Sequence, residues 1–306
     1  MKLVYLGTSG AMPTIKRGLS STVLVLDKEY IMVDCGEGTT RQFLKSNLKW
    51  NKPLTILITH MHSDHIMGLF GLLQSMDLMG RSEKVTIWGV RGIKTFTESV
   101  NRAVNFKFEF DVVIHEVEAG DTIVGWTNGI KITTCKSKHQ TPSLAYRIEL
   151  PDKEGALDAV KAIQLGVPKN SPLLGKLKRG EDVEVVTSKG IKTVHSKDVV
   201  GEPTKGLVIC FSGDTRPTDE LREFFKDADY LTHEATFLEE EQEYADKTKH
   251  STAYEAGFIA IKAAVKHLIL NHFSARYATT KGFYEEAIKA HPNMTCAKDL
   301  MEIELK

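Results

Sequence analysis

The segment that most constrains the fold is residues 59–65, which read THMHSDH and directly follow the apolar run Leu54–Ile58. Four of its seven residues are common metal ligands: His60, His62, Asp64 and His65. Residues two apart on an extended chain point the same way, so the first two histidines can bind one ion. A helical pattern begins at about Asp64, which lets the other two residues turn toward a second ion. Imidazole and carboxylate groups at this density favour Zn²⁺ or a similar divalent ion at the end of a buried strand.

Four ligands at one point do not complete two coordination spheres, so further ligands are expected elsewhere in the chain. Three more candidates follow apolar strand-like runs: His139, Asp214 and His272. The seven candidates provide three histidines for one ion, Asp64 with two histidines for the other, and a carboxylate between them. This set leaves a coordination position open for water, whereas a structural zinc site closes its sphere.

Short β-branched runs alternate with helical patterns along most of the chain. The strand-like runs are residues 3–6, 22–26, 30–33, 54–58, 85–88, 112–117, 130–134, 144–150, 207–211, 230–232 and 268–270. The helical patterns are residues 66–79, 93–104, 219–225, 253–264 and 281–290. Many strands with interleaved helices indicate an α/β sandwich rather than a helical bundle.

Composition limits the partners and the compartment. Forty Lys and Arg balance forty Asp and Glu, so a nucleic-acid partner would need a local basic patch. The longest apolar runs fall far short of the roughly 20 residues that span a bilayer, so no membrane segment is expected. The four cysteines form no CxxC pair, which argues against a disulfide scaffold or a thiolate metal site. These features predict a soluble protein of a reducing compartment, the cytoplasm.

One segment, residues 151–180, breaks the rhythm of strands and helices, because turn-forming Gly and Pro residues accumulate in it. Helical spacing is plausible only around residues 157–163, and residues 161–180 hold five Lys or Arg and no acid. A charge run of this kind is often a solvated surface loop. The alternative is an insertion that reaches out to bind a polyanion. Composition alone supports both interpretations equally.

The seven candidate ligands, read as HxHxDH followed by His139, Asp214 and His272, resemble the metallo-β-lactamase superfamily of two-metal hydrolases. Further segments narrow the resemblance: GTSG at 7–10, VDCGEGT at 33–39, HEATF at 233–237 and HST at 250–252. Together with the insertion at 165–177, they resemble the short form of ribonuclease Z, the tRNA 3′-processing endonuclease. Two stretches differ from the family pattern: residues 13–18 read PTIKRG instead of PxKxRN, and Ser171-Pro172 replaces a Gly-Pro pair.

This resemblance implies an αββα sandwich that forms one domain over residues 1–306. Residues 151–180 would be inserted in it as a flexible basic arm, an exosite for tRNA. The resemblance also implies two Zn²⁺ ions per subunit, with Mn²⁺ as a possible substitute. The first ion would be bound by His60, His62 and His139, and the second by Asp64, His65 and His272. Asp214 would bridge the two ions.

The resemblance further implies the reaction. The substrate would be precursor tRNA, cleaved to leave a 3′-hydroxyl on the tRNA and a 5′-phosphate on the trailer. Asp64 would accept a proton from the attacking water, and His250, oriented by Glu234, would protonate the leaving oxygen. Three cations of the insertion would contact the tRNA: Lys176, Lys178 and Arg179. Two other functions stay open, a small-molecule hydrolase of the same superfamily and a binding protein with a structural zinc.

Three assignments keep an alternative. His250 precedes Ser251-Thr252 at the expected start of a helix, so it could instead be a surface or helix-capping residue. Asp34 is expected either to fix a ligand imidazole by a hydrogen bond or to form the turn before Cys35-Gly36. Residues 66–79 are apolar around the helix, which fits a helix buried within one subunit or one that also packs on a second subunit. Because the family forms homodimers, we expect a homodimer.

Overall fold

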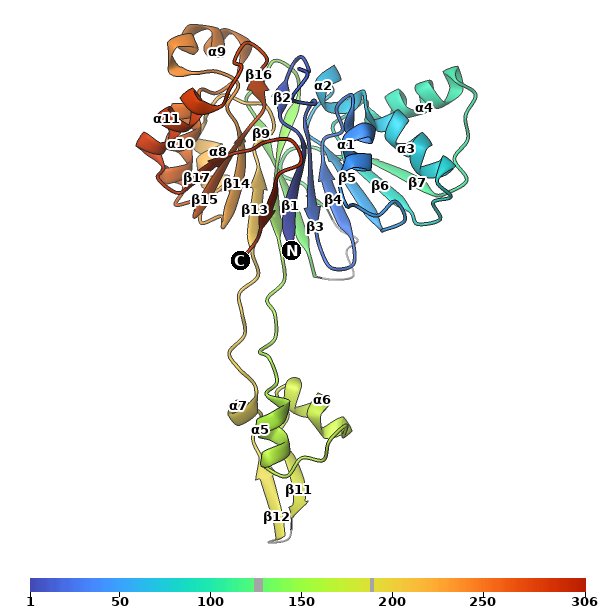
Figure 1. Ribbon diagram of the computed structural model, residues 1–306, viewed down its shortest axis with the longest axis vertical. Coiled ribbons are helices and arrows are strands. Elements are labelled where there is room, and N and C mark those ends of the chain that lie inside the picture. The colour runs from blue at the N-terminus through green and yellow to red at the C-terminus, as the bar shows by residue number, and fades with distance from the viewer. Residues whose placement is uncertain (124–128, 188–189) are drawn as a thin grey trace. The chain divides into compact units, whose positions relative to one another are not determined.

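The structure, a computed structural model, describes residues 1–123, 129–187 and 190–306, which form two compact units (Figure 1). Unit one contains residues 1–123, 132–148 and 208–306. Unit two contains residues 129–131, 149–187 and 190–207. In the part of the chain that the structure describes, no helix is long and apolar enough to cross a bilayer. All four cysteines are buried free thiols.

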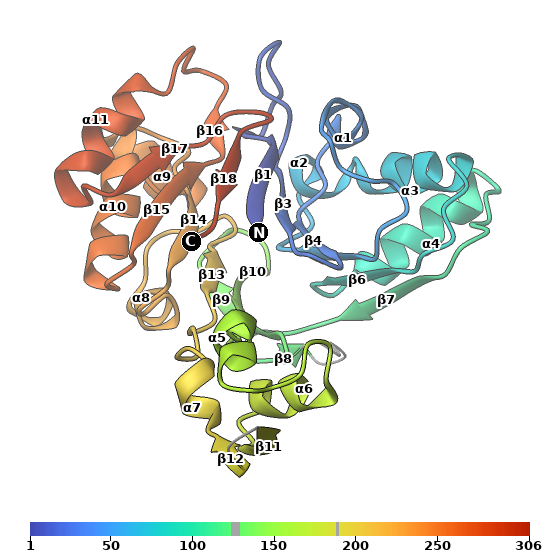
Figure 2. The same ribbon diagram turned by 60° about the horizontal axis from the view of Figure 1, so that its bottom comes forward.

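Unit one is built on two sheets that face each other, with helices on their outer sides (Figures 1 and 2). Within the described residues, the first sheet has the spatial order β18 (Glu302–Glu304), β1 (Lys2–Gly7), β3 (Ser21–Val25), β4 (Tyr30–Val33), β5 (Leu54–Ile58), β6 (Val85–Gly89) and β7 (Val112–Glu116). The second has the order β17 (Met294–Cys296), β15 (His267–Asn271), β14 (Tyr230–Glu234), β13 (Val208–Phe211), β10 (Ser143–Glu149), β9 (Lys131–Ser137) and β8 (Thr122–Ile123). The αββα sandwich is confirmed, and every predicted strand-like run overlaps one of these strands.

Parallel pairing places the carboxyl ends of neighbouring strands at the same edge of each sheet. β4, β5, β6 and β7 pair in parallel in the first sheet, as do β13, β14, β15 and β17 in the second. Inner parallel strands are covered on both faces and are therefore largely apolar, whereas the edge strand β7 is only partly buried. β5 reads LTILI and is buried at every position. Because parallel strands end at the same edge of a sheet, the residues that follow β4, β5, β13, β14 and β15 are brought together.

Most helices of unit one bury their apolar sides against the outer faces of the sheets. Those over the first sheet are α1 (Thr39–Lys45), α2 (Ser63–Ile66), α3 (Leu69–Leu78) and α4 (Ile93–Ala103). Those over the second are α8 (Asp219–Phe224), α10 (Ala253–Lys262) and α11 (Lys281–Ala290). A 3-10 turn at Glu239–Glu241 and α9 (Gln242–Thr248) lie beyond the end of β14, at the top of the unit in Figure 1. Leu69, Leu72 and Leu73 of α3 belong to one core, and Ala256 and Ile259 of α10 to the other.

One predicted helix is divided in the structure. The sequence predicted a single helix over residues 66–79, but α2 ends at Ile66 and α3 begins at Leu69. The prediction is wrong here because a Cβ on Gly68 would lie 2.0 Å from the carbonyl oxygen of Gly36. The backbone N of Gly68 donates a hydrogen bond to the carbonyl oxygen of Cys35 at 2.9 Å. The close approach of the turn after β4 therefore interrupts the helix just beyond the predicted ligands.

Unit two is smaller and has its own apolar core. Its elements are α5 (Ala159–Gln164), α6 (Pro172–Lys178), β11 (Val183–Thr187), β12 (Gly190–Val194) and α7 (Ser196–Val199). β11 and β12 form an antiparallel pair. The buried apolar side chains are Ala162, Val167, Leu177, Val183, Val185, Val194 and Val199.

The predicted insertion, residues 151–180, covers only part of this unit, which continues to Leu207. Helical spacing was expected only around residues 157–163, and the structure adds α6. A signal for α6 was present, because Ser171 caps the helix by accepting a hydrogen bond from the backbone N of Leu173 and Pro172 occupies its first turn. Four of the seven buried core residues come from β11, β12 and α7, which lie beyond the predicted end of the insertion.

Candidate metal centre and active site

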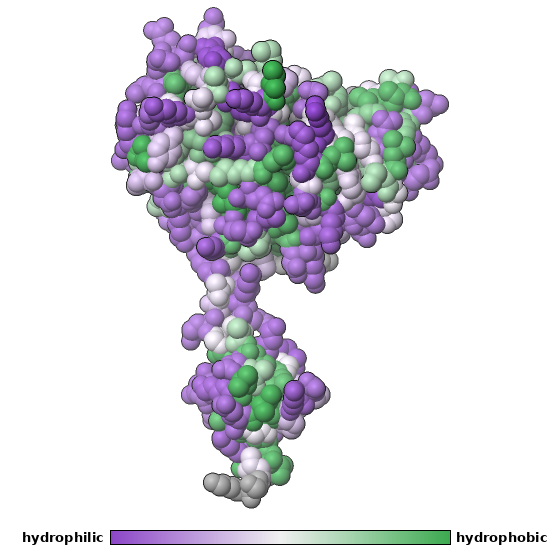
Figure 3. Space-filling view, in the orientation of Figure 1, coloured by the Kyte–Doolittle hydropathy of each residue, from purple (hydrophilic) through white to green (hydrophobic). Residues whose placement is uncertain are grey.

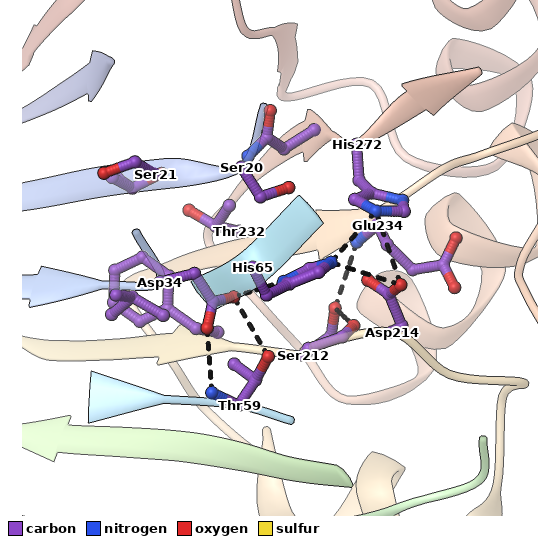
Figure 4. Close-up of a pocket in the computed structure, with 15 residues that line it drawn as sticks. Ser20, Ser21, Asp34, Thr59, His65, Ser212, Asp214, Thr232, Glu234 and His272 are labelled. Atoms are coloured by element: carbon purple, nitrogen blue, oxygen red, sulfur yellow. Dashed lines mark hydrogen bonds and ion pairs between the residues drawn. The ribbon is translucent and has the colours of Figure 1, made fainter. Parts of the chain in front are cut away.

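The residues predicted as ligands stand at the ends of the buried strands of unit one. His60 and His62 follow β5, and Asp64 and His65 lie in α2. His139 follows β9, Asp214 follows β13, and His272 follows β15. Figure 4 shows side chains from both sheets converging, with His65, His272 and Asp214 turned toward one another. The parallel order of the strands explains this convergence for the residues after β5, β13 and β15. His139 reaches the same place from β9, which pairs antiparallel with β8.

The seven side chains form two groups that share one carboxylate. One group is His60, His62, His139 and Asp214, and the other is Asp64, His65, His272 and Asp214. In each group the candidate ligand atoms all lie within 4.8 Å of one another. This is the division that the resemblance implied, with Asp214 common to both groups. The geometry thus brings together every residue predicted as a ligand.

The polar atoms at the centre of the cluster fit a divalent cation. Nε2 of His60 is buried and has no hydrogen-bond partner among the described residues. It lies 3.6 Å from Oδ2 of Asp214, and that oxygen lies 3.4 Å from Nε2 of His65 and 3.3 Å from Nε2 of His272. A buried polar atom without a partner costs about 1–3 kcal/mol, and coordination to a metal ion would remove that cost. Imidazole nitrogens around a shared carboxylate are donors that zinc prefers.

Charge within the cluster is consistent with this chemistry. Burial holds the pKa of His60 well below its usual range, and the neighbouring His65 lowers it further. Burial also disfavours protonation of His65, but the carboxylates of Asp214 and Asp34 raise its pKa well above the usual value. Burial would raise the pKa of Asp214, yet the imidazoles of His272 and His65 hold it well below its ordinary value. Neutral His60 and anionic Asp214 are the protonation states that bind a metal ion. The carboxylates around His65 carry negative charge that a bound cation would neutralise.

Hydrogen bonds behind the cluster fix the rings. Nδ1 of His65 lies 2.7 Å from Oδ2 of Asp34, and Thr59 donates its backbone N–H and its hydroxyl to the same carboxylate at 2.8 and 2.9 Å (Figure 4). Nδ1 of His139 lies 3.1 Å from the carbonyl oxygen of Lys249. Asp34 has a left-handed φ of 59°. Asp34 therefore fixes an imidazole, as one of its two interpretations expected, and its backbone takes up the left-handed conformation just before Cys35-Gly36.

The segment after β1 closes the cluster from another side. β2 (Ser9–Gly10) pairs with β16 (Phe273–Ser274), directly after His272. A Cβ on Gly10 would lie 2.5 Å from Cε1 of His272, so a glycine is required beside this ring. The backbone N of Ala11 donates a hydrogen bond to Oδ2 of Asp64 at 2.6 Å. Sequence analysis missed this contact because a backbone donor has no residue signature.

His250 and Glu234 lie beside the ligand cluster and form a third group with His272. Nδ1 of His250 is 2.9 Å from Oε1 of Glu234, and the His250 ring stacks on the His272 ring with centroids 5.5 Å apart. Burial would lower the pKa of His250, but the charge of Glu234 and its hydrogen bond raise it to about 9. The cap of α10 is Thr252, so the alternative of His250 as a helix cap is wrong.

Two residues that sequence analysis did not assign also support this group. The hydroxyl of Thr236 donates to Oε2 of Glu234 at 2.7 Å and lies 2.9 Å from Nδ1 of His272. Nη1 of Arg216 donates to the backbone carbonyl oxygen of His250 at 2.7 Å. Thr236 could have been found, because it belongs to the HEATF segment, whereas Arg216 had no signal beyond its position near Asp214.

The predicted tRNA-binding cations lie in unit two. Lys176 and Lys178 are exposed on α6, and Arg179 follows the helix. Nη2 of Arg179 forms an ion pair of 3.0 Å with Oε1 of Glu181, the residue just beyond the acid-free stretch. The two lysines therefore present their charge more freely than Arg179 does.

Known proteins resemble this chain in sequence over its whole length. The chain is 41% identical to the ribonuclease Z of Nitrosopumilus maritimus, with 100% of both proteins covered. It is 35% identical to the ribonuclease Z of Methanosarcina acetivorans, over 100% of this chain and 98% of that protein. The chain belongs to the ribonuclease Z family. The resemblance seen in the sequence is thereby confirmed.

Solved structures extend the comparison to three dimensions. The crystal structure of human tRNase Z, short form, has a TM-score of 0.71 at 26% identity and covers 100% of both chains. YhfI from Bacillus subtilis, a metallo-β-lactamase fold protein, has a TM-score of 0.69 at 17% identity over 99% of each chain, which shows the fold alone. A family model described as anti-Pycsar protein Apyc1 matches residues 1–149. This ribonuclease Z family member therefore has the metallo-β-lactamase fold and is a metal-dependent hydrolase.

Proposed function

We propose that this ribonuclease Z family member is a zinc-dependent endoribonuclease that removes the 3′ trailer from precursor tRNA in the cytoplasm. Cleavage leaves a 3′-hydroxyl on the tRNA and a 5′-phosphate on the trailer. The observation that carries the proposal is the pairing of His250 with Glu234 directly beside the seven-residue cluster. Hydrolysis of a phosphodiester whose leaving group is a ribose 3′ oxygen needs the phosphate charge neutralised and that oxygen protonated. A metal-loaded cluster and the neighbouring imidazole would supply the two side by side. The choice of tRNA follows from the relatives, which are named ribonuclease Z and tRNase Z.

We assign two Zn²⁺ ions per subunit to the two groups of ligands, with Mn²⁺ as a possible substitute. The first ion is assigned to His60, His62 and His139, the second to Asp64, His65 and His272, and Asp214 to both. When bound there, such a pair of ions would lower the pKa of a water molecule and neutralise the charge of the scissile phosphate.

Asp64 is the proposed acceptor of the proton from the attacking water. Burial would raise its pKa, but the charge of His65 and the hydrogen bond from His272 lower it, so the side chain is anionic at neutral pH. The backbone N–H of Ala11 fixes one of its oxygens. A carboxylate held in this way needs no rearrangement to take up a proton.

His250 is the proposed donor of the proton to the ribose 3′ oxygen. Its Nδ1 is engaged by Glu234, which leaves Nε2 to donate. Burial would raise the pKa of Glu234, but the charge of His250 lowers it, so the carboxylate stays anionic beside the imidazole. An anionic partner keeps the proton on the imidazole until the leaving oxygen takes it.

Unit two is proposed to bind the folded body of the tRNA. Its exposed cations include Lys161, Lys169, Lys176 and Lys178. Cations of this kind contact phosphate groups and read little sequence, which suits an enzyme that accepts many tRNAs. The metal ligands all belong to unit one, so the chemistry itself does not require unit two.

We further propose that the protein is a homodimer. Leu78 and Met79 at the end of α3 are 78% and 61% exposed, and hydrophobic residues gather on the surface over α3 and α4 in Figure 3. Large apolar side chains grouped on a surface indicate an interface. Sedimentation at micromolar protein should give the mass of two subunits, and a monomer mass would exclude the dimer.

The direct test of the function is cleavage of a precursor tRNA that carries a 3′ trailer, followed by mapping of both product ends. We expect a 3′-hydroxyl on the tRNA and a 5′-phosphate on the trailer. The opposite polarity would reject His250 as donor to a 3′ oxygen. No cleavage by the zinc-loaded protein, with hydrolysis of a small phosphodiester intact, would reject tRNA as the substrate.

A further inference from the structure

Arg216 ties His250 to the loop that carries Asp214. Arg216 follows Asp214 by two residues, and its Nη1 donates a hydrogen bond to the carbonyl oxygen of His250 at 2.7 Å. The next residue is tied to the same loop, because the hydroxyl of Ser251 donates to the carbonyl oxygen of Thr215 at 2.6 Å. The backbone carbonyl of the proposed proton donor and the side chain of the residue after it are thus both bonded to the loop of the proposed bridging ligand.

Carboxylates fix the guanidinium of Arg216. Both of its terminal nitrogens contact Glu255 in the first turn of α10, and Nη2 lies 2.9 Å from Oδ1 of Asp246 in α9. Glu255 also accepts a hydrogen bond from the backbone N of Thr252 at 2.9 Å, as part of the capping box of α10. A planar guanidinium donates several hydrogen bonds in fixed directions, which an ammonium group cannot do. Arg216 therefore links α9, the start of α10 and the loop after β13.

The surroundings of Arg216 do not suit direct contact with a substrate. Its side chain is only 12% exposed, and both terminal nitrogens are engaged by His250, Glu255 and Asp246. A cation that binds a phosphodiester needs accessible donors. Arg216 can therefore act on the reaction only through His250. The backbone N–H of His250 is bonded separately, to the carbonyl oxygen of Ala245 in α9.

We infer that Arg216 is a positioning residue for His250: it holds the backbone of His250 so that the imidazole, paired with Glu234, faces the leaving oxygen. This inference rests on the proposed role of His250 as proton donor. Loss of the planar guanidinium would release the carbonyl oxygen of His250 while leaving the seven metal ligands in place. The damage should therefore fall on protonation of the leaving group and not on metal binding.

The test is Arg216→Lys, which keeps the charge and loses the fixed set of donors. We expect the rate on precursor tRNA to fall about 10–100-fold, because a misplacement of about 1 Å has an effect of this size. The KM, the zinc content and the rate on bis(p-nitrophenyl) phosphate should stay within about twofold, because p-nitrophenolate leaves without protonation. Arg222→Lys is the matched control, since Arg222 is a surface residue of α8 paired with Asp219, and it should change neither rate.

A second substitution and a double variant keep the inference testable. Glu255→Gln removes one partner of Arg216 with little change in shape, and it should show the same pattern with a smaller loss, even if Arg216→Lys does not fold. In a His250→Ala background, Arg216→Lys should cause no further loss on precursor tRNA. Equal losses on both substrates, a further loss in that background, or no loss on tRNA would each overturn the inference. If His250→Ala itself does not distinguish the two substrates, the proposed role of His250 fails, whatever Arg216 does.

Discussion

The two units of this chain place their functional residues differently. In unit one the polar residues of the site are themselves buried: His60, Asp214 and Glu234 are 0%, 2% and 3% exposed. In unit two the proposed tRNA-binding lysines lie on the surface, over a small apolar core. A buried polar group is destabilised when any one of its partners is lost. Exposed cations each contribute a small part of the free energy of binding a polyanion, and these parts add up. Single substitutions should therefore abolish the chemistry of unit one but only weaken the binding by unit two.

The largest effect is expected from Asp214→Ala. This substitution removes the carboxylate that both ligand groups share, so bound zinc should fall and hydrolysis of precursor tRNA and bis(p-nitrophenyl) phosphate should be lost. His267→Ala is the control, because His267 is half-buried outside the cluster and contacts Thr295, and it should keep activity. Elemental analysis decides the assignment, since a zinc content equal to that of the parent would remove Asp214 from the ligands.

His250→Ala should separate protonation of the leaving group from metal binding in unit one. The rate on precursor tRNA should fall about 10²–10⁴-fold, the usual contribution of a general acid. Zinc content and tRNA affinity should be nearly unchanged, because His250 lies beside the ligand groups and not within either of the two that share Asp214. Hydrolysis of bis(p-nitrophenyl) phosphate should be far less affected. If both substrates suffer equally, His250 positions another group and is not the proton donor.

The sequence predicted the residues of the site in unit one, but not the contacts that hold them. Sequence analysis located the seven candidate ligands because each follows an apolar run, and a parallel sheet brings strand ends together. The contacts that hold the residues of the site, such as the backbone N–H of Ala11 on the candidate ligand Asp64 and Arg216 on the proposed proton donor His250, join residues far apart in sequence. No local pattern records them.

Unit two was predicted less completely for a related reason. Its core is assembled from short elements that include β11 and β12, and each contributes only one or two buried apolar residues. Such elements have too little periodicity to mark an end of the unit. The break between α2 and α3 was missed because it depends on the approach of Gly36 to Gly68, a tertiary contact.

Removing most of unit two should weaken binding and spare chemistry. The two chain segments that enter it come close together, because the backbone N of Gly201 donates to the carbonyl oxygen of Ala156 at 3.0 Å. Residues 157–200 can therefore be replaced by a short Gly/Ser linker. The KM for precursor tRNA should rise about tenfold or more, since the phosphate contacts are lost. Hydrolysis of bis(p-nitrophenyl) phosphate should persist. Unchanged tRNA cleavage would refute a binding role for unit two, and loss of both activities would mean that it supports the fold or the dimer.

The smallest effects are expected from single cations of unit two, measured as the dependence of tRNA affinity on salt. Lys176→Ala and Lys178→Ala should each lower the slope of log Kd against log salt by about 0.7–0.9, the value for one lost phosphate contact. Arg179→Ala should lower it less, because Glu181 already neutralises part of the charge of Arg179. Lys289→Ala, on an exposed position of α11 in unit one, is the matched control and should leave the slope unchanged. A flat slope for the parent protein would reject binding through phosphates altogether. An Arg179→Ala effect as large as that of either lysine would show that the ion pair with Glu181 opens when tRNA binds.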